Sequence, residues 1–257
     1  MTARLLLLWV GFAFSREADI QKRVVGGRQC QPNERLYHVR LSGLDPDGTW
    51  SFCGGSLLTD RWILTASHCW QPGRTMFAVV GVHPGPGQRV EIISEPRIYR
   101  DNNDNVHDIM LLKLPYPTNI PRVAYPDCDY SLQPGATVEI AGHGETTAGP
   151  NNERTNGESP TLQCANIDVV DCSEERKDMK KNDKKFYKRV KNDYWFCGNT
   201  SQVDVCPGDS GGVVVFDEKI YGVISFLGDP KNVCQKAAAF MDLCNPEYAA
   251  WIRRTIT

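Results

Sequence analysis

The segment CPGDSGG, from Cys206 to Gly212, says more about this chain than any other stretch of its sequence. Its single serine, Ser210, stands among glycines, which let the backbone turn sharply and let a second chain approach closely. A serine hydroxyl is a weak nucleophile by itself and needs a base to remove its proton. The segment therefore predicts that the rest of the sequence supplies a histidine and an acid that orients it.

His68 is the candidate base among the five histidines of the chain. It lies in LTASHC, after a strand-like run and directly before Cys69, where a disulfide would fix the backbone. Asp108 is the candidate acid because it opens the apolar run IMLLKL, and a carboxylate near an apolar strand orients a histidine more firmly than a solvated one. A histidine beside a cysteine is more often structural, and an aspartate at a strand start is usually a turn residue. Together with Ser210, their order indicates a nucleophilic site.

The N-terminus predicts export and processing. Residues 1–15 have a basic start, an apolar run too short to span a bilayer and a small-residue exit, which is typical of a secretory signal; a buried first helix is the alternative. Residues 16–23 end in Lys22-Arg23, which predicts a processing site, with an unprocessed exposed linker as the alternative. Cleavage after Arg23 would create a new amine on Val24.

The composition is that of a globular protein of 257 residues with a formal net charge of −2. This balance argues against nucleic-acid binding over the whole surface. Ten cysteines in a secreted chain favour disulfides, and the lack of close CxxC spacing weakens a metal-binding interpretation. No long apolar run follows the N-terminus, so we expect no membrane-spanning segment.

Most of the middle of the chain reads as short strands rich in β-branched and aromatic residues, separated by Gly, Pro, Asn and Asp. The predicted strands are LYHVRL, GGSLL, WILTA, MFAVVGV, RVEIIS, IMLLKL, TVEIAG, GVVVF and IYGVISF. Such a pattern favours β-barrels or a sandwich. Residues 121–135 contain three prolines and predict a connection between two halves.

Two segments read as helices instead. At the C-terminus, Asn245 is a good N-cap and Pro246 suits a first helical turn, so we expect a closing helix over residues 245–257. Residues 174–193 carry nine basic and five acidic side chains and predict one amphipathic helix with a basic outer stripe. That stripe is either a solvated face or a docking surface for a polyanion or an acidic partner.

These residues and motifs resemble the chymotrypsin-fold serine peptidases of the trypsin-like group. The resemblance runs from Val24 to the C-terminal helix and rests on VVGG, CGGSLL, LTASHC, DIMLLKL and GDSGG. It implies an all-β fold of two six-stranded antiparallel β-barrels with a C-terminal helix and the active site between the barrels. The implied peptidase domain is 24–257, with an N-terminal barrel at about 24–122, a C-terminal barrel at about 123–244 and the helix at 245–257.

The resemblance also implies the roles of the site residues. Ser210 would be the nucleophile, His68 the general base and acid, and Asp108 the orienting carboxylate. The backbone N–H groups of Gly208 and Ser210 would form the oxyanion hole. Asp209 would pair with the amine of Val24 that cleavage after Arg23 releases, so we expect the uncleaved chain to be nearly inactive.

The resemblance pairs all ten cysteines. The implied bridges are Cys30–Cys164, Cys53–Cys69, Cys128–Cys244, Cys172–Cys197 and Cys206–Cys234. Each could contribute about 2–4 kcal/mol to stability.

Substrate choice would depend on the pocket for the residue before the scissile bond. Asp204 matches the acid at the pocket floor in trypsins, which favours cleavage after Arg or Lys, since an uncompensated buried charge is costly. The walls depart from the family, however, and a narrowed pocket that takes a small residue is the alternative. The departing positions are Val205, Phe226, Leu227 and Ala238, with Gly228 as a second candidate for the open wall.

Further expectations follow from the same resemblance. Ser225 would align the substrate as an added strand along Tyr221–Phe226. HPGPGQRV, from His83, offers no carboxylate ligands, so we expect no calcium site. We also expect no other metal and no cofactor. Asn199-Thr200-Ser201 is a glycosylation sequon. The expected partners are protein or peptide substrates, an activating protease and a protein inhibitor, and we expect a secreted monomer.

A different class of function competes with a peptidase. Binding proteins built on a protease scaffold usually lose a catalytic residue or the oxyanion glycine, whereas this chain keeps His68, Asp108, Ser210 and Gly208. The sequence therefore favours an enzyme, and covalent labelling of Ser210 by a fluorophosphonate would separate the two.

Overall fold

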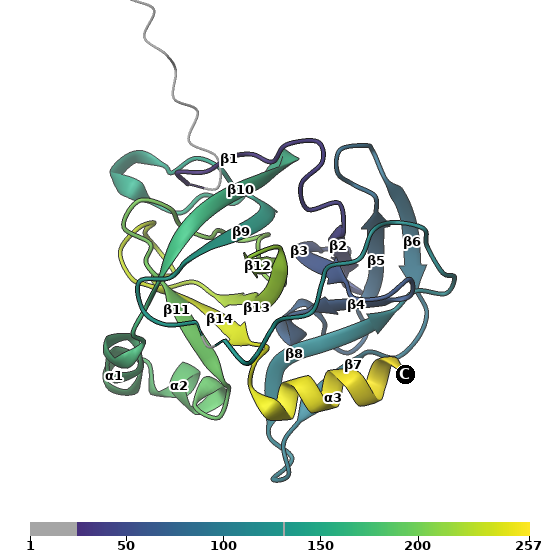
Figure 1. Cartoon of the computed structure of the whole chain (residues 1–257). Helices are drawn as coiled ribbons and strands as arrows, with labels where there is room; N and C mark the ends of the chain where they lie inside the picture. Colours follow the sequence, from purple (N-terminus) through teal and green to yellow (C-terminus); the bar gives the residue numbers. More distant parts are fainter. Residues whose placement is uncertain (1–24, 131) are drawn as a thin grey trace, which may run out of the picture.

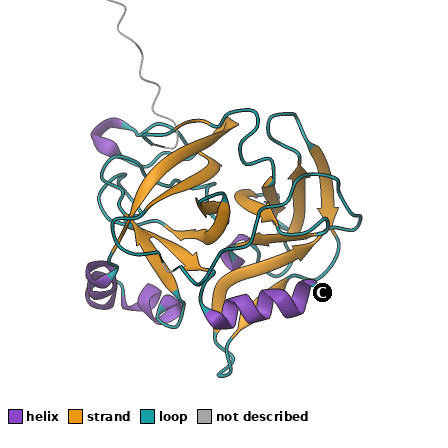
Figure 2. Cartoon of the chain, in the orientation of Figure 1, coloured by secondary structure: helices purple, strands orange, loops and turns teal. Residues whose placement is uncertain are grey.

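Two curled β-sheets stand side by side in the computed structural model, which describes residues 25–130 and 132–257 (Figures 1 and 2). The expected signal, the processing segment, Arg23 and Val24 lie outside the described residues.

The first sheet has seven strands in the order β6-β5-β2-β3-β4-β8-β7, each antiparallel to its neighbours. Their bounds are β2 His38–Leu44, β3 Trp50–Leu57, β4 Trp62–Thr65, β5 Thr75–Val80, β6 Gln88–Ile92, β7 Arg97–Arg100 and β8 Val106–Lys113. The pleat explains why buried and more exposed residues alternate along a strand, because successive side chains point to opposite faces. In β5 the buried residues are Met76, Ala78 and Val80, in strict alternation.

The second sheet closes on itself, because β9 pairs with both β10 and β12. Its bounds are β1 Arg28–Gln29, β9 Thr137–Gly144, β10 Glu158–Val170, β11 Trp195–Gly198, β12 Val213–Phe216, β13 Lys219–Phe226 and β14 Ala238–Asp242. Six strands form the closed barrel, and the short β1 joins it by pairing with β10 although it comes from the start of the chain. Closure removes exposed sheet edges.

The predicted all-β, chymotrypsin-like fold is confirmed: the second sheet is a closed six-stranded barrel extended by β1, and the first is a seven-stranded half-barrel. All nine predicted strands are present. The sequence analysis missed β1, β7, β10, β11 and β14. β10 was missed although it is the longest, because polar residues interrupt its alternation.

The C-terminal helix α3, Pro246–Ile256, is confirmed. The Asn245 side chain accepts hydrogen bonds from the N–H groups of Glu247 and Tyr248, as expected of an N-cap. Tyr248 and Ile252 are buried. Figure 1 shows α3 lying along β8 and β7, so the end of the chain packs on the first sheet.

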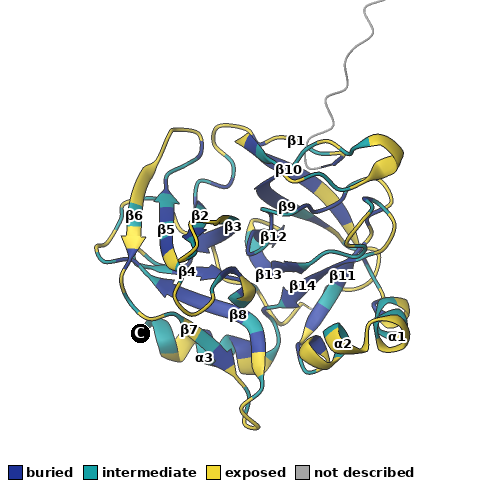
Figure 3. Cartoon of the chain, turned by 180° about the vertical axis from the view of Figure 1, so that it is seen from behind, coloured by how far each residue is buried: buried dark blue, intermediate teal, exposed yellow. Residues whose placement is uncertain are grey.

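The single helix predicted over 174–193 is wrong. The structure has two helices, α1 Ser173–Asn182 and α2 Lys184–Val190, which meet at Asp183. The Asp183 carboxylate accepts the N–H of Phe186 at 2.9 Å and so caps a new helix where the prediction continued the old one. Both helices are largely exposed on their outer side (Figure 3).

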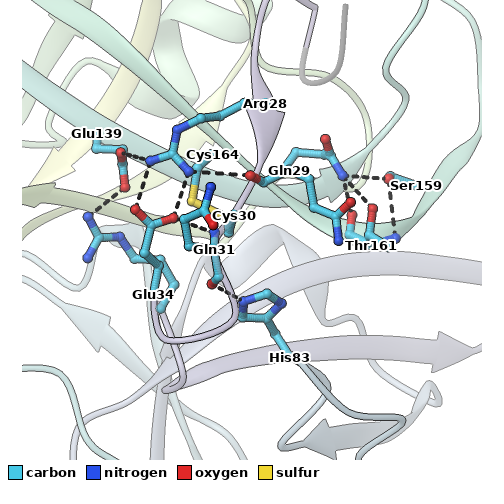
Figure 4. The surroundings of a disulfide bond; sticks show 12 residues. Arg28, Gln29, Cys30, Gln31, Glu34, His83, Glu139, Ser159, Thr161 and Cys164 are labelled. Carbon is cyan, nitrogen blue, oxygen red and sulfur yellow. Dashed lines mark hydrogen bonds and ion pairs between the residues drawn. A yellow bond between two sulfur atoms is a disulfide. The ribbon is translucent and has the colours of Figure 1, made fainter. Parts of the chain in front are cut away.

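Four of the five implied disulfides are formed: Cys30–Cys164, Cys53–Cys69, Cys128–Cys244 and Cys172–Cys197. Figure 4 shows the first, which joins the segment after β1 to β10. Cys206 and Cys234 are the two described cysteines outside these bonds. They belong to one small apolar cluster with Val25 and Val233. The bridge between them stays a prediction.

Candidate active site

His68 lies in a short 3₁₀ turn, Ser67–Cys69, that follows β4 and is tied to β3 by the Cys53–Cys69 disulfide. Its backbone N–H donates to Asp108 Oδ1 at 2.9 Å, and its ring Nδ1 lies 2.8 Å from Asp108 Oδ2. A histidine held at Nδ1 by a carboxylate presents its Nε2 for proton transfer. The structure therefore brings together the base and the acid that the sequence indicated.

Asp108 is held on several sides. It lies near the start of β8, and the hydroxyl groups of Ser67 and Ser225 both donate to its carboxylate. Burial opposes its charge, but His68 and the Ser225 hydroxyl outweigh burial and hold the pKa of Asp108 below its usual value. Burial likewise disfavours protonated His68, but Asp108 outweighs it and raises the pKa of the imidazole. The side-chain role of Ser225 was missed by the sequence analysis.

A buried aromatic cluster lies behind the acid. The Tyr248 hydroxyl accepts the N–H of Tyr194 at 3.1 Å and lies 2.7 Å from His107 Nδ1, to which it can donate its own proton. The Tyr99 ring meets His107 and Tyr248 edge-on, at centroid distances of 5.0 and 5.1 Å. Since His107 directly precedes Asp108, this cluster fixes the backbone that presents the acid.

Ser210 lies where the two sheets meet. Its carbonyl accepts the N–H of Gly54 in β3 at 2.7 Å. This bond ties residues 206–212, the serine loop, to the first sheet. Gly208 has a φ of +101°, and Gly211 has a φ of +81° with Gly54 O only 2.4 Å from where a Cβ would stand. Only glycine suits either position. The backbone bend around Ser210 thus depends on the glycines of the motif.

His68 and Ser210 line one cavity of about 900 Å³, together with Ser67, Asp108 and Ser225. Phe226, Leu227 and Gly228 line it as well, as expected of pocket residues. Val205, Ala238 and Asp204, which were also expected in the pocket, are fully buried and do not line it. Ala238 and Val205 instead pack in the core of the second barrel.

The helix α2 contributes to this cavity, which the sequence did not indicate. Phe186, Arg189 and Val190 line it, and the Phe186 ring meets Phe226 edge-on at 5.2 Å. Trp195 packs on Phe226 in the same way, at 5.2 Å. The apolar side predicted for the segment 174–193 therefore faces the candidate active site.

Asp209 is buried at 1% exposure and accepts two backbone N–H groups, from Gly144 at 2.7 Å and from Cys206 at 2.8 Å. A Cβ on Gly142 would stand 2.0 Å from its carboxylate, so glycine is required there. Burial raises the pKa of Asp209 to about 6. This environment would favour a cationic partner for the ionised carboxylate.

Asp204 has a partner that the sequence analysis missed. The Arg154 guanidinium lies 2.6 Å from Asp204 Oδ2, and the two side chains are 4% and 0% exposed. The N–H of Cys234 donates to the same oxygen at 2.7 Å. Burial raises the pKa of Asp204, and Arg154 opposes that shift. No short motif signals this pair, because 50 residues separate its members.

Two side-chain groups within the described ranges have metal-ligand spacing: Cys53, His68 and Cys69, and Cys30, Glu34 and Cys164. The cysteines of each group form a disulfide with one another, so they offer no thiolate ligands. Asn199 of the predicted sequon is exposed, and its side-chain oxygen accepts the N–H of Ser201 at 3.0 Å.

A closed β-barrel and a half-barrel, with a His–Asp pair and a serine at a shared cavity, define a chymotrypsin-fold, trypsin-like serine peptidase. The family model described as Trypsin matches residues 24–252, and the chain belongs to this family. It is a serine endopeptidase by that membership.

Among its relatives, Kallikrein-8 of Homo sapiens is 29% identical over 98% of this chain and 94% of its own. Trypsin-4 of Rattus norvegicus is 30% identical over 100% of this chain and 99% of its own. The chain thus matches these relatives over nearly their whole length.

Solved structures agree on the fold. The structure of GrC superposes with a TM-score of 0.71 at 23% identity, covering 90% of this chain and 98% of that one. Scabies mite inactivated protease paralogue S-D1 gives a TM-score of 0.69 at 20% identity, covering 90% of this chain and 96% of that one. One of these similar structures is thus an inactivated protease, so the fold alone does not decide activity.

Proposed function

We propose that the chain is a secreted serine endopeptidase, activated by cleavage after Arg23, that uses Ser210, His68 and Asp108. The observation that carries this proposal is the His68–Asp108 pair, with Nδ1 2.8 Å from Oδ2, lining one cavity with Ser210. Geometry of this kind performs acyl transfer, because it joins a nucleophile, a base and an orienting acid.

In the proposed reaction, Ser210 Oγ attacks the carbonyl carbon of the scissile bond while His68 Nε2 takes the hydroxyl proton. The tetrahedral oxyanion is stabilised by the N–H groups of Gly208 and Ser210, each worth about 3–4 kcal/mol. His68 then donates that proton to the leaving amine as the C–N bond breaks. Water attacks the resulting ester and passes a proton to His68, which gives it to Ser210 Oγ as the ester C–O bond breaks, releasing the acid and free Ser210.

Activation follows from Asp209. Its carboxylate is buried among backbone N–H groups, and its pKa of about 6 reflects an environment that resists a negative charge. The Val24 amine released by cleavage would supply the missing positive charge. The pairing of Val25 with Asp204 carries the start of the peptidase domain toward the serine loop, which supports this assignment.

Secretion is supported by chemistry as well as by the expected signal at 1–15. The chain forms four disulfides, which persist in oxidising compartments. Among the described residues, the helices are all too short or too polar to cross a bilayer. We further propose that the enzyme acts as a monomer on protein or peptide substrates, with an activating protease and a protein inhibitor as its partners.

Labelling with a fluorophosphonate tests the enzyme and its activation together. The full-length chain is compared with the chain cut after Arg23, with Ser210→Ala as the control that removes only the nucleophile. We expect strong labelling of the cut chain, weak labelling of the intact chain and none of the variant. If the cut chain is not labelled, the protein is not an active peptidase and a binding protein is favoured. If labelling is equal before and after cleavage, the proposed activation after Arg23 is wrong.

A further inference from the structure

Asp204, the expected floor of the substrate pocket, is already paired with an arginine of the same chain. Arg154 comes from the loop between β9 and β10, and its guanidinium donates to Asp204 Oδ2 at 2.6 Å. Its other two nitrogens donate to the carbonyls of Val205 and Asp229, each at 2.6 Å. Three acceptors therefore hold one guanidinium, which is the arrangement that an arginine side chain of a substrate would need for itself.

The loop that carries Arg154 is anchored. The N–H of Arg154 donates to Lys231 O at 2.8 Å, and Glu153 pairs with Asn232 as an isolated antiparallel bridge. The N–H of Val233 donates to Asn152 O at 2.9 Å. The segments 152–154 and 231–233 thus run side by side, so the position of Arg154 is set by backbone bonds as well as by its charge.

Charge balance decides what this pocket can accept. Asp204 and Arg154 together are neutral, and both are nearly inaccessible to solvent. A lysine or arginine entering from a substrate would bring a second positive charge beside the guanidinium, which already neutralises Asp204. Burying an uncompensated charge is strongly unfavourable.

Charged side chains line part of the cavity, among them Asp178, Asp183 and Lys236, but the segment 226–230 adds only uncharged residues to the lining. Neither Arg154 nor Asp204 lines it, whereas Phe226, Leu227 and Pro230 do. Gly228 also lines it, and a Cβ there would stand 1.9 Å from Lys236 O, so the wall cannot carry a larger residue at that point. The lining residues on either side of Asp229, whose carbonyl Arg154 binds, are therefore uncharged.

We propose that Arg154 takes the place beside Asp204 that a basic side chain of a substrate would otherwise fill. The enzyme would then cleave after an uncharged apolar residue. This proposal rests on the proposed function and replaces the expected preference for Arg or Lys. Arg154 determines specificity by neutralising Asp204, and the Asp204 carboxylate then has a structural role and does not bind the substrate.

The test uses the full-length chain cut after Arg23 and peptides that differ only in the residue before the scissile bond. We expect kcat/KM with leucine or phenylalanine to exceed that with arginine or lysine by at least tenfold. Arg154→Ala frees Asp204, so it is expected to raise kcat/KM for the arginine peptide at least tenfold. The double variant Arg154→Ala/Asp204→Asn is expected to lose that gain.

Three controls keep the result interpretable. Arg154→Gln removes the charge but keeps a donor for Val205 O, which guards against a variant that fails to fold. Arg35→Ala removes another buried arginine, paired with Glu139 and Glu218 away from the active-site cavity, and is expected to leave the substrate preference unchanged. Binding of benzamidine, a small aryl cation, is expected to tighten at least tenfold in Arg154→Ala.

Two outcomes overturn the proposal: a wild-type enzyme that cleaves after arginine or lysine as fast as after leucine, or an Arg154→Ala variant that gains neither arginine cleavage nor benzamidine affinity. Fluorophosphonate labelling separates this failure from failure of the proposed function. A labelled enzyme that prefers arginine refutes only the role of Arg154, whereas an unlabelled chain refutes the peptidase itself.

Discussion

Ser225 and Asp108 stand 117 positions apart in the sequence, yet the Ser225 hydroxyl donates a hydrogen bond to Asp108 Oδ2. The same oxygen faces His68 Nδ1 at 2.8 Å, so one carboxylate oxygen joins a residue of the second barrel to the base of the first. The candidate active site is therefore held across the junction of the two sheets.

Replacing Ser225 by alanine removes one donor to an ionised carboxylate, an interaction worth about 1.5–3 kcal/mol. We expect kcat/KM to fall about tenfold or more, because each 1.36 kcal/mol of lost barrier lowering is a factor of about ten. Steady-state kinetics of the cut enzyme measure this. Ser56→Ala, at another buried serine, is the matched control, and an equal loss there would show a general packing effect.

Tyr248→Phe removes the hydroxyl that serves both His107 Nδ1 and the N–H of Tyr194. Leaving buried polar groups without a partner costs about 1–3 kcal/mol, so we expect the free energy of unfolding to fall by that amount. Urea unfolding measures it. Tyr221→Phe, which loses a bond only to Asp127 O, is the comparison, and an equal or larger effect there would contradict the prediction.

Asp209 makes the stability of the uncleaved chain depend on pH. Burial raises its folded-state pKa to about 6, above the ordinary 3.8. The folded state then binds this proton more tightly than the unfolded chain, so the stabilisation is complete below about pH 4 and is lost as pH rises through 6. A pKa difference of this size between the folded and unfolded chain corresponds to about 3 kcal/mol in the free energy of unfolding.

Urea unfolding of the uncut Ser210→Ala chain from pH 4 to 7.5 measures that dependence, and Asp209→Asn is expected to remove it. Cleavage after Arg23 is expected to weaken it, since an amine beside Asp209 lowers the pKa of the carboxyl. A pH profile identical in the Asp209→Asn variant would rule out this role.

Cys206 and Cys234 are expected to be joined in the secreted protein. Both belong to the apolar cluster of Val25 and Val233, and burial raises the pKa of the Cys206 thiol to about 12, which makes a reduced thiol poorly reactive there. Thiol titration of the denatured, unreduced protein is expected to find no free thiol. Two thiols per chain would show that this bridge does not form.

The basic surface of α1 and α2 remains a candidate for polyanion binding. Because a break at Asp183 divides the segment, the lysines do not form one continuous helical stripe. Retention on a heparin column that weakens with salt is expected, and changing Lys184, Lys185 and Lys188 to alanine is expected to reduce it. Changing the same number of lysines elsewhere, Lys113, Lys219 and Lys231, is the control, and equal loss there would indicate only net charge.

Short sequence motifs predicted much of the candidate site and of the fold. Ser210, His68, Asp108 and Gly208 were identifiable because their chemistry requires particular residue types in short, recognisable segments. The nine predicted strands and α3 followed from periodicity and capping. The continuous helix over 174–193 failed because an aspartate such as Asp183 is tolerated on an exposed helix face and is also a strong N-cap.

The sequence by itself thus determined the candidate catalytic residues and the chymotrypsin-like fold of this protein. Only the tertiary structure decided the partners of the buried polar and charged groups: Ser225 on Asp108, Tyr248 beside His107, and Arg154 on Asp204. The reason is physical. A motif encodes chemistry over a few neighbouring residues, whereas a buried polar or charged group pairs with whichever group the fold brings within a few ångströms. In these pairs that group lies 50 to 141 positions away.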